Sequence, residues 1–156
     1  MTAEFAKGGT ALMNRIISRA TLAERRNLFK KGSRVELVHM NDPYTILPGC
    51  ERGYVSHVDS NGTVFVNWDS GITLGCCYET DVLRKLTELE IIKEQAYVIM
   101  KTGCTNMMNY VSVLNFAKEY GFHEICDLIE KDSRKYSLLM LNEGLSDVGH
   151  EEGIVY

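Results

Sequence analysis

The sequence predicts an α+β protein in which a small β-barrel is framed by an N-terminal helix and a C-terminal bundle of three or four short helices. Residues 33–86 contain short β-branched runs separated by tight turns, a pattern typical of small closed barrels. Residues 85–144 instead repeat their apolar side chains at helical spacing. The expected organisation is a helical arm over 1–31, the barrel over 32–86, a helical domain over 87–144 and an acidic tail over 145–156.

The N-terminal arm combines a predicted helix with a concentration of basic residues. The run TLAERRNLFKKG predicts a helix that Thr21 caps and that ends at Gly32, because Glu24 follows the cap at capping-box spacing. Between residues 15 and 34 Glu24 is the sole acid, although the whole chain has a formal net charge of −4. A segment of this kind is either a solvated helix face or a surface that binds nucleic-acid phosphates. The cations that would contact phosphates are Arg15, Arg19, Arg25, Arg26, Lys30 and Lys31.

The barrel is expected to contain strands over 34–40, 53–59, 63–69 and 72–77. Asn61-Gly62 predicts a hairpin turn between the second and third strands, because both residues tolerate positive φ. Two-residue alternation places Val64, Val66 and Trp68 on one face of the third strand.

Trp68 is the only tryptophan, and its place at the end of this strand leaves two interpretations open. It either fills the small core or lines a shallow aromatic groove between the 41–53 loop and the 68–71 turn. Both prolines of the chain fall in that loop, and long loops on rigid scaffolds often carry binding residues. The groove hypothesis assigns ligand contacts to Asp42, Tyr44, Arg52, Trp68 and Asp69, with the aromatic rings stacking a flat or proline-like ligand.

Glycines punctuate the second half of the chain and predict where its helices end. Gly103, Gly121 and Gly144 each follow an apolar-periodic run, as is usual at helix C-termini. Asn106 or Asn109, and Asp132, are the expected N-caps.

The sequence offers little for catalysis, so no catalytic residue, metal site or cofactor is predicted. It contains no phosphate-binding glycine loop and no Cys-x-x-Cys pair. His123 and Cys126 could share a helix face, but a closed zinc site needs four ligands. Cys104 precedes an expected helix start, where a thiol pKa can fall. The absence of an apolar leader, together with five cysteines, predicts a reduced, cytoplasmic protein without a membrane segment.

The stretch from Gly32 to Leu74 carries a set of motifs that belong together: Met-x-Asp-Pro-Tyr at 40–44, Pro-Gly at 48–49 and Trp-Asp-x-Gly at 68–71. Because of these motifs, the stretch resembles a family of uncharacterised small-barrel domains encoded by bacteriophages and mobile elements of Gram-positive bacteria. Thr105, Asn106, Met107, Gly121, Phe122 and Tyr136 likewise resemble landmarks of a short, uncharacterised helical family from the same genomes. The resemblance implies a phage or mobile-element origin and a barrel of the Src-homology-3 type, but no reaction.

These observations favour a non-enzymatic accessory binding protein in the host bacterial cytoplasm. The first hypothesis is counter-defence, by binding a host defence protein or by sequestering a small nucleotide signal. The alternative is a nucleic-acid accessory factor that uses the basic 15–34 segment, and a small hydrolase is the remote third. Because each half is too short to bury a large core, a homo-oligomer is expected.

Overall fold

The computed structural model describes residues 16–44 and 47–142. Arg15, the first part of the expected arm and the acidic tail over 145–156 therefore lie outside the described residues. The chain divides into two compact units, with the boundary between Lys85 and Leu86. The first contains a helix and a sheet, and the second contains helices, so the architecture is α+β.

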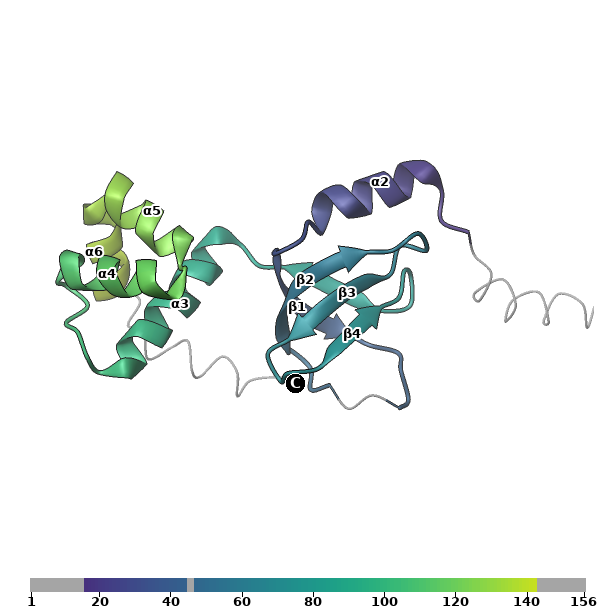
Figure 1. The fold of residues 1–156 in the computed structure, drawn as a ribbon, viewed down its shortest axis with the longest axis horizontal. Coiled ribbons are helices and arrows are strands. Elements are labelled where there is room, and N and C mark those ends of the chain that lie inside the picture. Colours follow the sequence, from purple (N-terminus) through teal and green to yellow (C-terminus); the bar gives the residue numbers. More distant parts are fainter. Residues whose placement is uncertain (1–15, 45–46, 143–156) are drawn as a thin grey trace, which may run out of the picture. The chain divides into compact units, whose positions relative to one another are not determined.

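The first unit contains a five-stranded antiparallel sheet (Figure 1). Its strands are β1 (Arg34–His39), β2 (Arg52–Val58), β3 (Val64–Trp68), β4 (Thr73–Cys76) and β5 (Val82–Lys85). They lie in the order β4-β3-β2-β1-β5, so the last strand pairs with the first. β4 and β5 remain the two edges, and the predicted closure into a barrel is therefore wrong. The sequence expectation also lacked β5, a four-residue strand that follows the CCYETD segment.

Two-residue alternation gives this sheet one apolar face. Val64, Val66 and Trp68 of β3 are all buried, whereas Phe65 and Asn67 lie on the opposite face. Val35, Leu37, Val55, Cys76 and Phe29 complete the same buried cluster. In β1, Glu36 likewise alternates with the buried Val35 and Leu37 and lies on the opposite face.

The turn between β2 and β3 is built on Asp59 and Gly62. Asp59 accepts hydrogen bonds from the backbone N–H groups of Asn61 and Thr63 at 2.8 and 2.9 Å. Gly62 has a φ of +79°, whereas Asn61 does not have positive φ. The hairpin therefore exists as predicted, but the carboxylate and one glycine form the turn in place of an Asn-Gly pair.

Helix α2 (Arg19–Leu28) precedes the sheet and is capped by Ser18, not by Thr21. The Ser18 hydroxyl accepts from the backbone N–H of Thr21 at 3.1 Å, so Thr21 lies inside the first turn. The helix ends at Leu28, with Phe29 as its C-cap. A Cβ at Gly62 would lie 2.6 Å from Ile17, so this glycine also permits the chain before α2 to pack over the hairpin.

The second unit consists of α3 (Glu88–Thr102), α4 (Tyr110–Tyr120), α5 (His123–Lys131) and α6 (Ser133–Asn142). Thr87 and Glu90 form a capping box at the start of α3, and Asn109 caps α4. Gly103 and Gly121 end α3 and α4 with positive φ, as predicted. Gly144 lies outside the described residues.

The core of the second unit centres on Ile99, Val113, Ile125 and Tyr136, which are fully buried. The Tyr136 hydroxyl donates a hydrogen bond to the Met107 carbonyl at 2.7 Å, and its ring meets Tyr110 edge-on. Among the described helices, none is long and apolar enough to cross a membrane.

Candidate functional site

Trp68 is the residue on which the groove hypothesis depended, and its indole belongs to the core. Only 3% of the residue is exposed. It packs in the cluster that includes Phe29, Val35 and Val66, with Leu47 of the 41–53 loop against that cluster. The structure therefore supports the interpretation of Trp68 as a core residue. Its ring has no open face on which a ligand could stack.

Asp69 follows the indole and forms an ion pair with Arg34 of β1. The two guanidinium N–H groups donate to the two carboxylate oxygens at 2.7 and 2.6 Å. Arg34 is 6% exposed, and its guanidinium carbon lies 4.5 Å from the ring centroid of Tyr54. The carboxylate therefore compensates a buried charge within the sheet.

Arg52 takes part in a second charged row, which crosses three strands. Glu36 of β1 lies opposite Arg52 of β2 and opposite Arg84 of β5 in the strand registers. Its two carboxylate oxygens accept from Arg52 at 2.9 Å and from Arg84 at 3.0 Å. This row explains the placement of Arg52 without any ligand.

Asp42 and Tyr44 lie in the 41–53 loop, and they are not gathered with the other predicted contacts. The Asp42 carboxylate accepts from the backbone N–H of Tyr44 at 2.9 Å, as turn aspartates commonly do. Tyr44 is 93% exposed. The loop does meet the 68–71 turn at its far end, where Ser70 N–H donates to Glu51 at 2.9 Å.

Of the five predicted residues, Arg52, Trp68 and Asp69 are neighbours, because the Asp69 N–H donates to the Arg52 carbonyl at 2.9 Å and Trp68 pairs with Gly53 in the sheet register. The side chains of Arg52 and Asp69 pair with residues of β1, and the Trp68 ring is buried.

The basic residues around α2 have a different arrangement. Four basic residues are exposed, and their side chains make no hydrogen bond or ion pair with any residue in the described ranges. We call them the α2 basic patch: Arg19, Arg26, Lys30 and Lys31. Arg19 and Arg26 are seven residues apart and therefore share one face of the helix. Lys30 and Lys31 follow directly after the helix end.

Arg25 differs from these cations because it fastens α2 to the sheet. Its Nε donates to the Gly62 carbonyl at 2.8 Å. Its guanidinium carbon also lies 5.4 and 5.1 Å from the ring centroids of Phe29 and Tyr78. Burial lowers the pKa of Arg25. Arg25 is therefore a structural residue, although the sequence placed it among the phosphate contacts.

Three cysteines have thiols whose pKa is raised by burial. The pKa of Cys76 is raised to about 12, mainly by burial. Burial is also the main cause that raises the pKa values of Cys77 and Cys126. Cys104 lies after the C-cap of α3, well before α4 begins, so it is not at the helix start that the sequence suggested. Among residues 16–44 and 47–142, no three His, Cys, Asp or Glu side chains are grouped as a metal site would require.

Comparison with protein families agrees with the division of the fold. Residues 18–86 match the model described as Domain of unknown function (DUF4314). Residues 89–142 match Domain of unknown function (DUF5049). The chain thus matches two domain families of unknown function, one after the other. Their order is the one that the sequence resemblance predicted, and no curated protein matches the chain.

Proposed function

We propose that this protein is a non-enzymatic binding protein that contacts the phosphate backbone of nucleic acid through the α2 basic patch. This proposal rests on four exposed cations that form no ion pair with any described acid: Arg19, Arg26, Lys30 and Lys31. Cations of this kind supply the affinity of sequence-independent nucleic-acid binding by releasing counterions from phosphates.

The geometry of α2 suits a backbone contact. At 1.5 Å of rise per residue, Arg19 and Arg26 are separated by about 10 Å along the helix axis. Duplex DNA carries one phosphate per strand for about every 3.4 Å of its axis, so the pair would span about three nucleotides. Because Arg25 holds the helix on the hairpin, the patch is presented from a fixed position.

The composition of α2 is poor for stability but suited to contact with an anion. None of its residues is fully buried, and its first turn contains Arg19 but no acid. A cation at the positive end of the helix dipole is unfavourable, typically by about 0.3–1 kcal/mol. A bound phosphate would relieve this repulsion. A partner of opposite charge thus accounts for residues that the isolated fold does not require.

The test is fluorescence anisotropy with labelled duplex and single-stranded oligonucleotides of mixed sequence, titrated from 50 to 200 mM salt. Four phosphate contacts predict a log–log salt slope of about −3.6 on duplex DNA, and hence an affinity loss of about 150-fold over this range. Arg19→Gln together with Arg26→Gln should weaken binding at 50 mM salt and make the slope less steep by about two.

The control variant removes two positive charges from the second unit, Lys118→Gln together with Lys131→Gln. Both lysines pair with acids of their own unit, Glu130 and Asp127, so nucleic-acid binding should not change. The proposal fails if the wild-type chain binds none of the DNA or RNA probes at 50 mM salt. It also fails if the control variant loses as much affinity as the α2 variant.

Three finer predictions remain from the sequence. The pairing of β5 with β1 at one end of the meander supports a relationship with Src-homology-3-type sheets. The phage origin and a counter-defence role stay predictions. The nucleotide-sequestering form of that role would have to work without the indole, because Trp68 is buried.

A further inference from the structure

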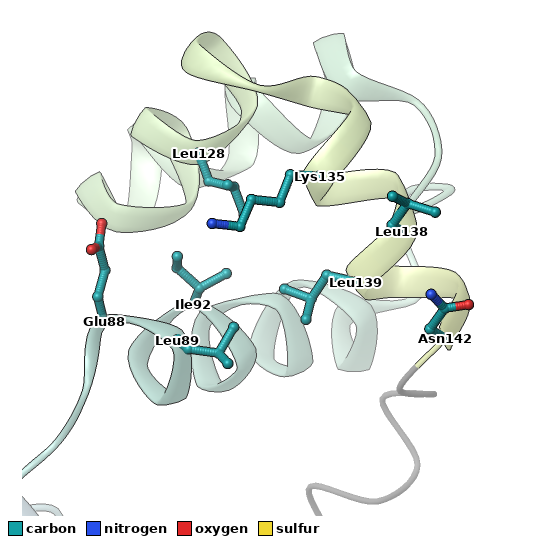
Figure 2. Close-up of a pocket in the computed structure, with 8 residues that line it drawn as sticks. All are labelled: Glu88, Leu89, Ile92, Leu128, Lys135, Leu138, Leu139 and Asn142. Carbon is teal, nitrogen blue, oxygen red and sulfur yellow. The ribbon is translucent and has the colours of Figure 1, made fainter.

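A groove on the surface of the second unit is lined by residues of α3, α5 and α6 (Figure 2). Its volume is about 420 Å³. The apolar residues that line it are Leu89, Ile92, Leu128, Leu138 and Leu139, and the polar ones are Glu88, Lys135 and Asn142. The groove is thus an apolar channel with one acid and one base.

Two of the leucines that line the groove do not belong to the core of their own unit. Leu89 of α3 is 44% exposed and Leu138 of α6 is 49% exposed. Leu141, which follows on α6 but is not a lining residue, is 68% exposed. By contrast, Ile92 and Tyr136 on the same helices are buried. Exposed apolar side chains gathered on two neighbouring helices are typical of a surface that another protein covers.

The two charges of the groove restrict what can cover it. Figure 2 shows the Lys135 amino group directed into the groove, with Glu88 at one end. Neither side chain makes a hydrogen bond or ion pair with another residue that the structure describes. An occupant that buries the leucines would remove water from these charges, so it must supply both an acid and a base.

We propose that this groove is a two-fold interface between two copies of the chain. In a two-fold interface the same surface serves both partners, so a contact from residue i to residue j occurs twice. Glu88 of one protomer would pair with the partner's Lys135, and Lys135 with the partner's Glu88. α6 of each protomer, which carries Leu138 and Leu141, would lie against the groove of the other.

A second copy meets the charge requirement better than the C-terminal segment of the same chain. Residues 143–156 contain four acids but no lysine or arginine. That segment could neutralise Lys135, but it would bring further negative charge to Glu88. A second copy brings one group of each sign.

The test is sedimentation equilibrium of the full chain with charge-reversed variants. The wild type should dimerise, and Glu88→Lys or Lys135→Glu should each weaken association at least about tenfold, because like charges then meet twice. An equimolar mixture of the two single variants should regain the wild-type affinity, because each protomer of the mixed dimer meets the opposite charge. An ion pair within one chain, or a change in the stability of α3, would not be rescued by mixing.

Leu138→Asp should abolish dimerisation without loss of helical circular dichroism, because Leu138 lines the groove and is 49% exposed in the single chain. Its matched control is Val111→Asp on α4, where the side chain is 69% exposed and lies outside the groove; this variant should dimerise normally.

The proposal is overturned if the wild type remains monomeric up to about 1 mM, or if the mixture of charge variants stays as weak as its components. It is also overturned if deletion of residues 143–156 creates or tightens the dimer, because that segment would then occupy the groove. None of these results depends on the α2 basic patch.

Discussion

Asp69→Asn measures what the Arg34–Asp69 pair contributes to the first unit. Removing one partner of a fully buried ion pair costs about 3–5 kcal/mol, whereas exposed pairs contribute about 0–1 kcal/mol. Here the Arg34 side chain is 6% exposed and that of Asp69 is 49% exposed. Asparagine retains one acceptor oxygen but no charge. We therefore expect a loss of about 2 kcal/mol in the free energy of unfolding.

The assay is urea unfolding followed by tryptophan fluorescence. Trp68 is the single tryptophan and lies in the core of the sheet, so its emission reports the first unit alone. With a urea dependence of about 1 kcal/mol/M for a unit of this size, the midpoint should fall by about 2 M.

The matched control is Asp42→Asn, because asparagine preserves the side-chain oxygen that accepts from the Tyr44 N–H. Its midpoint should stay within about 0.5 M of the wild type. If Asp69→Asn also stays within that margin, the bidentate pair is not a significant source of stability, and the structural explanation of Asp69 is wrong.

Three further variants test other parts of the structure. Trp68→Ala should destabilise the first unit by about 3–5 kcal/mol in thermal unfolding followed by circular dichroism, and an unchanged melting temperature would contradict the core position. The pKa of Cys76 is raised in the folded state to about 12, so the unfolded thiol ionises first. Stability should therefore fall as the pH rises from about 9 to 12, by up to about 4 kcal/mol, and Cys76→Ala should remove most of this dependence. Burial likewise raises the pKa of Tyr136 to about 12. Tyr136→Phe should lower the free energy of unfolding at neutral pH by about 1–3 kcal/mol, because the Met107 carbonyl loses its hydrogen-bond donor. The same variant should lose less helical circular dichroism above pH 10 than the wild type.

Local patterns in the sequence predicted the parts of the fold that local physics decides. Val64, Val66 and Trp68 are buried together because alternate residues of a strand share one face. Gly103 and Gly121 end their helices because each adopts positive φ. The N-cap of α2 was misplaced because Ser18 and Thr21 are both good caps, and a choice between them depends on where the preceding chain packs.

The interactions that organise the candidate site are non-local, and periodicity does not contain them. Arg34 and Asp69 are 35 positions apart, and Glu36 and Arg84 are 48 apart. Their meeting depends on strand register, which the sequence pattern did not provide. In α6, Leu139 and Met140 pack against the core at helical spacing from the buried Tyr136, whereas Leu138 is exposed. The sequence grouped the cations of the basic segment together, and it did not distinguish Arg25, which contacts the Gly62 carbonyl, from its neighbours.

The open sheet has a consequence for how the protein avoids fibrous aggregation. β4 and β5 end the sheet, and each has one side without a neighbouring strand in the described ranges. Exposed edges are sites where foreign strands can add. Here both edge strands are four residues long, so an added strand would gain few backbone hydrogen bonds. Lengthening either edge, for instance by inserting two β-branched residues, should make the protein more prone to aggregate.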